Sequence, residues 1–127
     1  MTILYAGDYL EIKHDEQRNI LYCRWFGFQE TDKIVRAGQT ILDHVRSNRI
    51  SKVLNDNRDV RGPWQDAADW TAKEWFPAMM DAGLTHFAWI LSSDVFAANS
   101  AKRASEGTPI VKAFHSYPEA YEWLIKH

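Results

Sequence analysis

The densest group of polar side chains in the sequence follows the apolar pair Val53 and Leu54. It consists of Asn55, Asp56, Asn57, Arg58 and Asp59. Carboxylates, amides and a guanidinium within one short segment could hold a polar ligand or a protein partner by hydrogen bonds and charge. The structural alternative is that the Asn and Asp side chains cap a turn and that Arg58 pairs with a neighbouring carboxylate. Both interpretations place the segment where a buried strand ends.

Three more polar residues are expected at the same edge. Ser92 and Ser93 follow the apolar run 86–91, and His115 follows the strand-like run 110–114. Ligands of an open parallel sheet bind beyond the carboxyl ends of its strands, so these residues join the candidates. Asp56, Arg58 and His115 would be the acid–base and anion-binding set if the protein were an enzyme. The structural alternatives are helix caps for the serines and a solvated loop for His115.

The sequence predicts neither a metal site nor a cofactor site. A calcium loop starting at Asn55 would need glycine and glutamate where the chain has Val60 and Asp66. The single cysteine, Cys23, excludes an intramolecular disulfide and a four-cysteine cluster. No pair with the short spacing of zinc ligands occurs among the five histidines, His14, His44, His86, His115 and His127. A nucleophile elbow and a glycine-rich phosphate loop are also missing from the sequence.

Tryptophan is concentrated in one predicted helix, residues 64–76. Trp64 and Trp75 share a helical face, whereas Trp70 lies off it, so the three cannot all be buried against one sheet surface. Some indole surface is therefore expected to stay accessible. It could form an apolar groove for a small ligand, a lipid or a partner, lined by Trp64, Trp70, Phe76, Met79 and Met80. The alternative is packing around Pro77 or against a second subunit.

Hydrophobic periodicity predicts the first half of the chain as a hairpin, a helix and a strand. The hairpin pairs residues 9–13 with residues 20–26, where apolar and strand-forming side chains predominate. A helix over residues 30–48 carries Gly38 on its apolar face, where it lets the helix approach the sheet closely. A short strand over residues 52–55 then runs into a polar stretch that ends at Gly62.

The second half is predicted as alternating helices and strands. Pro63 starts the tryptophan-rich helix, Pro77 kinks or breaks it, and Gly83 ends it in a left-handed conformation. A buried strand over residues 86–91 precedes a helix that Asp94 caps and that ends at Ser105. A strand over residues 110–114 leads to a final helix, which a capping box at 116–119 begins. The order predicts one α/β domain over residues 1–127, with a five-stranded, mostly parallel sheet and one antiparallel strand.

This element order resembles the STAS-like fold of bacterial anti-sigma-factor antagonists, which CRAL-TRIO lipid-binding domains share. The chain is similar to small bacterial proteins with that fold and no assigned activity. The resemblance rests on residues 20–27, residues 54–58, the tryptophan-rich helix before Gly83, and residues 120–124. In STAS proteins a serine or threonine after the third strand is the regulatory phosphorylation site. Residues 55–65 contain neither, so this site is not carried over.

Composition narrows the functional classes. The chain of 127 residues has 46% hydrophobic residues and 15 Lys and Arg against 17 Asp and Glu, which predicts a folded core and little attraction to nucleic acid. No run reaches the roughly 18 apolar residues of a membrane span. A receiver domain built on Asp56, Ser92 and Lys112 is disfavoured, because receivers begin with a strand and a helix rather than a hairpin.

The sequence therefore predicts a non-enzymatic cytoplasmic module that regulates or binds an unknown protein partner. The alternative is a carrier for a small apolar ligand or lipid, by analogy with the CRAL-TRIO domains. Homodimerisation through exposed aromatic surface is compatible with the sequence, although no residue pattern requires it.

Overall fold

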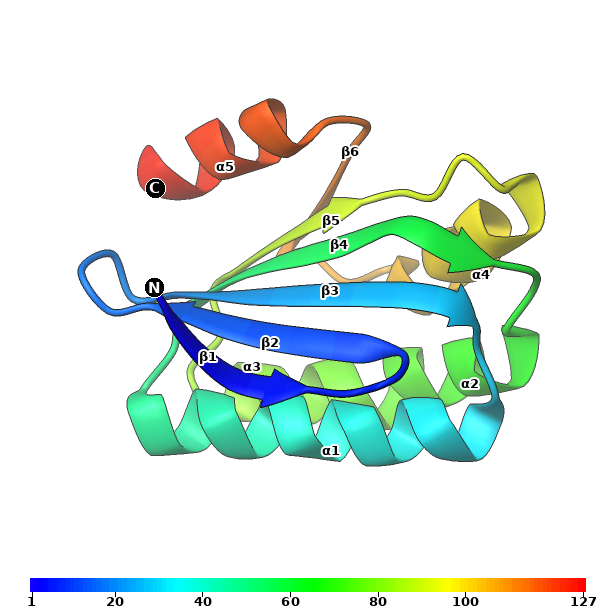
Figure 1. Ribbon diagram of the computed structural model, residues 1–127, viewed down its shortest axis with the longest axis horizontal. Helices are drawn as coiled ribbons and strands as arrows, with labels where there is room; N and C mark the ends of the chain where they lie inside the picture. The colour runs from blue at the N-terminus through cyan, green and yellow to red at the C-terminus, as the bar shows by residue number, and fades with distance from the viewer.

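One mixed β-sheet forms the centre of the fold, and its six strands follow one another in chain order (Figure 1). The computed structural model describes all residues, Met1–His127. The strands are β1 (Thr2–Ala6), β2 (Leu10–Asp15), β3 (Ile20–Phe28), β4 (Lys52–Arg61), β5 (His86–Ile90) and β6 (Val111–Phe114). The first three strands pair antiparallel and the last four pair parallel, so β2 alone runs against the others. The α/β class is confirmed, but the predicted number of five strands is wrong.

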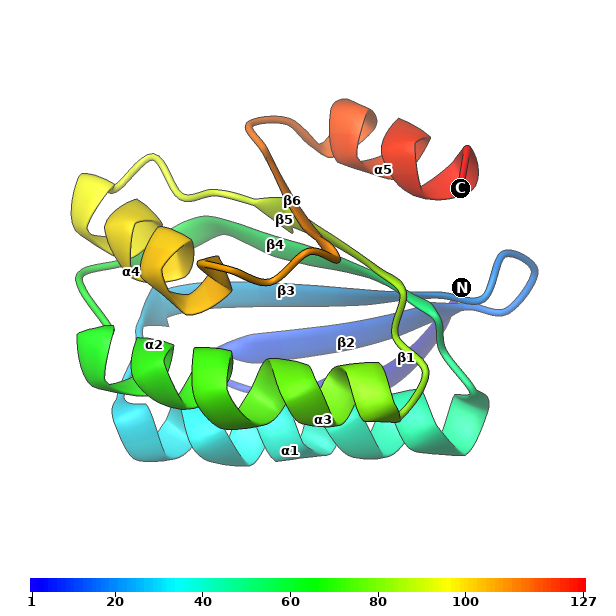
Figure 2. The same ribbon diagram turned by 180° about the vertical axis from the view of Figure 1, so that it is seen from behind.

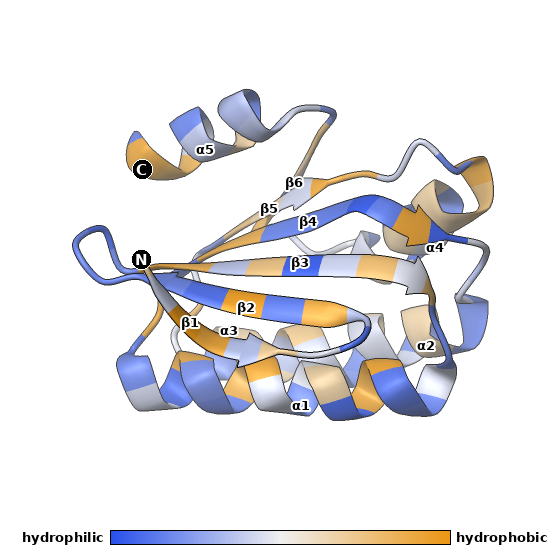
Figure 3. Ribbon diagram, in the orientation of Figure 1, coloured by the Kyte–Doolittle hydropathy of each residue, from blue (hydrophilic) through white to orange (hydrophobic).

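The additional strand is β1, which pairs with β2 at the edge of the sheet. Its residues are mostly exposed, so it lacks the alternation of buried and exposed positions that marks a half-buried strand. Strand β2 does show that alternation, both in its burial and in its hydropathy (Figure 3). The signal for β1 was the apolar run Ile3, Leu4 and Tyr5 ahead of the turn at Gly7 and Asp8.

Helices cover both faces of the sheet (Figure 2). One face is covered by α1 (Thr31–Asn48), by the helix α2–η1–α3 (Gln65–Asp81) and by α4 (Val95–Ser105). The opposite face carries α5 (Tyr117–Ile125), which packs over β4, β5 and β6. The larger hydrophobic core lies under the first group of helices, and a smaller one lies under α5. No helix combines the length and the apolar character that a membrane crossing needs.

A π-helical turn interrupts the tryptophan-rich helix where Pro77 was expected to kink or break it. The helix consists of α2 (Gln65–Trp70), the π-helical segment η1 (Thr71–Trp75) and α3 (Phe76–Asp81). The Phe76 N–H donates to the Thr71 carbonyl, five residues earlier. This wider turn directly precedes Pro77, which has no N–H to donate to the preceding turn. The helix continues past the proline instead of breaking there. The helix ends as predicted, with Gly83 at a φ of 109°.

Strand β4 is much longer than predicted, because the polar residues after Asn55 continue it instead of forming a loop. It stays paired with β3 up to the partners Phe28 and Arg61. The register advances from Arg24 opposite Asp56 to Phe26 opposite Asp59, which places one extra residue in β4 as a β-bulge. Bulges redirect side chains between the two faces of a sheet. The expectation that residues 55–59 lie beyond the strand end is therefore wrong.

Asp94 caps α4, as the sequence predicts, and also fixes the loop that follows β4. Its carboxylate accepts hydrogen bonds from the backbone N–H of Gly62 at 2.7 Å and of Phe96 at 2.9 Å. The bond from Gly62, followed by those from Phe96 and Ala97, lowers the pKa of Asp94 below its ordinary value of 3.8. The stabilisation is thus present above that value and is lost as the pH falls through the lower folded-state pKa.

We expect Asp94→Ala to lower the melting temperature at pH 7, because three backbone N–H groups lose their charged acceptor. The difference from the wild type should shrink as the pH falls below 3.8 and through the lower folded-state pKa, where the wild-type carboxylate becomes protonated. Melting curves recorded by circular dichroism across this range measure both effects. Ser93→Ala, at the exposed neighbouring position, is the control and should melt like the wild type. A difference that stays constant down to about pH 2, well below the ordinary pKa of a carboxyl group, would contradict the role of the charge.

Candidate functional site

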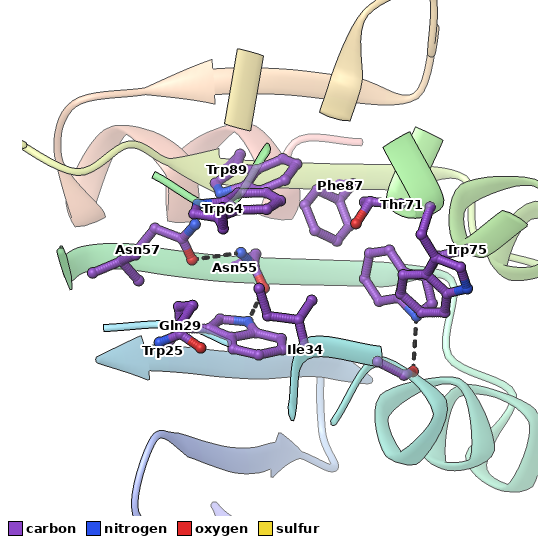
Figure 4. Close-up of a pocket in the computed structure, with 13 residues that line it drawn as sticks. Trp25, Gln29, Ile34, Asn55, Asn57, Trp64, Thr71, Trp75, Phe87 and Trp89 are labelled. Atoms are coloured by element: carbon purple, nitrogen blue, oxygen red, sulfur yellow. Dashed lines mark hydrogen bonds between the residues drawn. The ribbon is translucent and has the colours of Figure 1, made fainter. Parts of the chain in front are cut away.

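A pocket lies between the sheet and the helices α1 and α2–η1–α3 (Figure 4). It is lined by 13 residues, of which five are tryptophans: Trp25, Trp64, Trp70, Trp75 and Trp89. We call it the tryptophan pocket. None of its lining residues carries a charge. About 40 Å³ inside it is open to water-sized atoms, which is room for roughly three waters at about 10–15 Å³ each.

Neighbouring strands build the floor of the pocket. Asn55 on β4 lies opposite Trp89 on β5 in the parallel register, and Trp25 on β3 reaches Asn55 from the other side. Phe87, two residues before Trp89, points to the same face, as the period of a strand requires. Trp64, which precedes α2, stacks on Trp89 with ring centroids 6.0 Å apart and planes at 24°. These side chains come from four separate segments of the chain.

A chain of hydrogen bonds orients the two asparagines of β4. The Trp25 Nε1–H donates to Asn55 Oδ1 at 2.9 Å, and Asn55 Nδ2 donates to Asn57 Oδ1 at 3.0 Å. An indole nitrogen can only donate, so it fixes which end of the Asn55 amide faces it. The bond from Asn55 Nδ2 likewise fixes the Asn57 amide, because only the amide oxygen can accept it. Asn57 Nδ2 is then left without an acceptor in the protein. Both asparagines are buried, at 3% and 5% exposure.

The helices form the opposite wall, and Gly38 brings them together. Trp75 Nε1–H donates to the Gly38 carbonyl at 2.8 Å, and a Cβ added to Gly38 would lie 2.9 Å from the Trp70 ring. The glycine therefore allows two indoles of the neighbouring helix to approach α1, rather than bringing α1 onto the sheet. Trp70 and Gln29 are the only lining side chains that are not buried, so they mark the mouth. The prediction of a partly accessible indole is confirmed at Trp70.

Three buried polar side-chain atoms have no hydrogen-bond partner in the protein: Gln29 Oε1, Trp64 Nε1 and Trp89 Nε1. All three belong to residues of the tryptophan pocket. Gln29 Nε2 donates to the backbone carbonyl oxygens of Phe26 and Gly27, so the oxygen of this amide must face away from them. A buried polar atom without a partner costs about 1–3 kcal/mol. A ligand with matching polar atoms would remove that cost.

The structure divides the polar cluster of residues 55–59 between two faces of the sheet. Asn55 and Asn57 line the tryptophan pocket, whereas Asp56, Arg58 and Asp59 do not. The Asp56 carboxylate accepts two bonds from the Arg58 guanidinium, from Nη2 to Oδ2 at 2.7 Å and from Nε to Oδ1 at 3.0 Å. The hydrogen bonds that the Arg58 guanidinium donates to the Asp56 carboxylate raise the pKa of Arg58 above its ordinary value. Asp59 pairs with Arg24 on β3 at 3.0 Å. The structural alternative for Arg58, pairing with a neighbouring carboxylate, is thus what the structure shows.

The remaining polar candidates lie outside the pocket. Ser92 is buried and structural, because its Oγ donates to the Val60 carbonyl at 2.6 Å and accepts from the Asp94 N–H at 3.0 Å. Ser93 and His115 are exposed. His115 forms no hydrogen bond with the ion pair of Asp56 and Arg58. The structure therefore does not assemble the acid–base set that these three residues were expected to form.

Of the residues expected to line an apolar groove, only Trp64 and Trp70 do so. Phe76 and Met79 are fully buried in the core, and Met80 packs against it. Nine other lining residues were not among the predicted site residues, and Trp25 and Trp89 are two of them. A signal was available, because Trp25, Asn55 and Trp89 occupy inward positions on three neighbouring strands.

No family model matches the chain, and no curated protein matches its sequence. The assignment of a function therefore depends on the pocket itself.

Proposed function

We propose that the protein is a non-enzymatic binding module that holds a small, uncharged ligand in the tryptophan pocket. The observation that carries this proposal is that the only buried side-chain polar atoms without a partner all belong to this pocket. Elsewhere in the protein, buried polar side chains are paired, as native structures require. The residues that carry unpaired polar atoms all line one cavity, which is typical of a site that a ligand completes.

The construction of the pocket supports the same function. Apolar walls with a few oriented polar groups are the usual composition of small-molecule sites. A π-helical turn contributes Thr71 and Trp75 to the wall, and such turns occur frequently at functional sites. The β-bulge of β4 lies between Asp56 and Asp59 and so includes Asn57, and bulges also occur preferentially beside such sites.

A STAS-like architecture is part of the proposal. The order of elements from β2 to α5 is the one that the resemblance implies, with β1 added in front. Within that architecture, the ligand-carrier function of the CRAL-TRIO domains agrees with a ligand pocket better than a phosphorylation switch does. The tryptophan pocket would then be the carrier site.

A regulatory or protein-interaction role is a second candidate, which an exposed apolar surface favours. Phe28, Val95 and Phe96 are 79%, 61% and 63% exposed. They lie around one loop, because Gly62 borders the Phe28 ring and binds Asp94, the residue before Val95. If this surface mediates self-association, sedimentation velocity should show a wild-type dimer that Phe28→Ser with Phe96→Ser dissociates. A monomer at all concentrations would remove self-association from this candidate role.

The binding function can be tested with xenon under pressure, an uncharged probe small enough for a cavity of about 40 Å³. At about ten times its dissociation constant, a ligand stabilises the folded state by about 1.4 kcal/mol, which raises the melting temperature of a domain of this size by about 5 °C. Val60→Phe places a larger side chain in the pocket wall and should abolish the shift. Val95→Phe, the same change at an exposed position, should preserve it.

If Val60→Phe does not fold, Ile34→Phe fills the pocket from α1 instead. The proposal fails if xenon leaves the wild-type melting temperature unchanged. It also fails if the shift persists undiminished in the filled variant.

A further inference from the structure

Two histidines from distant parts of the chain meet beside the end of α5. His86 is the first residue of β5, and His127 follows Lys126, the residue that caps the end of α5. Their ring centroids are 5.4 Å apart, and the ring planes meet at 36°. Neither histidine lines the tryptophan pocket, so this contact is independent of the proposed function.

The separation of the two rings matches a pair of imidazoles that bind one metal ion. Imidazole nitrogen binds Zn²⁺ at about 2.0–2.1 Å, and at tetrahedral angles two such rings have centroids about 5 Å apart. The observed 5.4 Å is close to that value. The short sequence spacing of zinc ligands does not predict this pair, because the packing of α5 on the sheet brings its two members together.

Hydrogen bonds hold the proton of each neutral ring on Nδ1. His127 Nδ1 lies 2.7 Å from the Trp123 carbonyl oxygen, which can only accept, so this nitrogen carries the proton. Thr85 Oγ1 donates its one proton to the Ser51 carbonyl at 3.1 Å and therefore accepts from His86 Nδ1 at 2.9 Å. The lone pair that can bind a metal is then on Nε2 in both rings. Bonds of this kind orient metal-binding histidines in proteins.

Both Nε2 atoms are available to an ion from solution. The two Nδ1 bonds are the only hydrogen bonds that these rings form in the protein. His86 is partly exposed and His127 is exposed. Burial lowers the pKa of His86 below its ordinary value of 6.5, and the charges of His127 and Lys52 lower it further. The His86 ring is therefore neutral at pH 7, which is the form that binds metals.

The surroundings of the pair determine which ion fits. No third histidine, cysteine or carboxylate side chain joins the two rings, so water must complete the coordination of an ion. Two imidazoles without carboxylates favour Zn²⁺ and its neighbours over Mg²⁺ and Ca²⁺, which prefer oxygen ligands. Lys52 repels a cation, but its ammonium is bound to the Leu124 carbonyl at 2.8 Å. The partial negative charge at the end of α5 attracts a cation and opposes that repulsion.

We propose that His86 and His127 bind one Zn²⁺ ion through their Nε2 atoms, with water as the remaining ligands. His86 belongs to the sheet and His127 follows α5, so the ion joins the last helix to β5. Zinc binding then stabilises the folded chain, including the smaller core that α5 covers.

Calorimetric titration of the tag-free chain with Zn²⁺, at about pH 7.5, where ordinary histidines are neutral, tests this site. We expect one ion per chain. His86→Ala and His127→Ala should each weaken binding at least about tenfold, since even the loss of a group that orients a metal ligand has an effect of that size. His115→Ala, which removes an exposed histidine outside the pair, is the matched control and should bind like the wild type. Mg²⁺ should not bind.

Nitrogen-15 spectra of the histidine rings identify the binding atoms. In the free protein both rings should carry their proton on Nδ1, and Zn²⁺ should shift the Nε2 signals of His86 and His127 while leaving those of His115 in place. His127→Ala changes an exposed side chain beyond the last helix, so a loss of binding in this variant does not reflect misfolding. The proposal is overturned if His127→Ala binds Zn²⁺ as tightly as the wild type. Equal shifts at His115 and at the pair would also overturn it, because they would show unspecific binding to surface histidines.

Discussion

Replacing Phe76 with alanine is expected to lower the free energy of unfolding by about 3–5 kcal/mol. Phe76 has no exposed surface and lies at the centre of the aromatic core. Its ring centroid is 5.0 Å from that of Phe87, 5.1 Å from that of Trp75 and 6.0 Å from that of Trp89. The substitution removes these contacts and leaves a cavity that the surrounding rings cannot fill without leaving their positions. Urea denaturation followed by tryptophan fluorescence measures the change.

Phe96→Ala is the matched control for this substitution. It makes the same chemical change on α4, where the ring is 63% exposed, and should alter the free energy of unfolding by no more than about 0.5 kcal/mol. Similar losses for the two variants would contradict the burial of Phe76 and the arrangement of the core beneath the pocket.

We expect the second large effect from Asn55→Ala, at about 2–4 kcal/mol of unfolding free energy. The substitution leaves the Trp25 Nε1–H and Asn57 Oδ1 buried without their present partners. It would also release Asn57 from its fixed orientation, so ligand binding should weaken together with stability. Chemical denaturation gives the first quantity, and a probe titration gives the second. Asn99→Ala, on the solvent side of α4, should change neither.

A double-mutant cycle tests whether the hydrogen bond from Trp25 is the reason. In a Trp25→Phe background the indole donor is already absent, so Asn55→Ala should cost about 1 kcal/mol less than it does in the wild type. Additive effects of the two substitutions would show that the bond contributes nothing to stability. The account of the oriented asparagines would then be wrong.

Local signals made most of the fold predictable from the sequence. The caps at Asp94 and Ser116 depend on neighbours within three residues, and the structure confirms both, the second with a bond from the Glu119 N–H to Ser116 Oγ. The left-handed glycine at Gly83 and the periodicity of α1 are equally local. Strand β1 was missed because an exposed edge strand carries no alternating pattern.

The errors at the candidate site come from interactions between distant parts of the chain. Asn55 and Asn57 resemble turn residues in the sequence, but a tryptophan 30 residues before Asn55 provides the hydrogen bond that allows Asn55 to be buried in a strand. The π-helical turn similarly cannot be predicted from the spacing of apolar residues, because its wider turn changes which residues share a helical face. The two loop carbonyls that orient the Gln29 amide are apparent only in the folded chain.

Native mass spectrometry of the freshly purified protein tests the central claim most directly, because it detects a ligand that the pocket retains. Wild type and Val95→Phe should each show the chain with an added small, uncharged molecule whose mass disappears on denaturation. Val60→Phe should show the chain alone, since its larger side chain fills the pocket wall. The bare chain mass in all three proteins, or an added mass that Val60→Phe also retains, would contradict ligand binding in the tryptophan pocket.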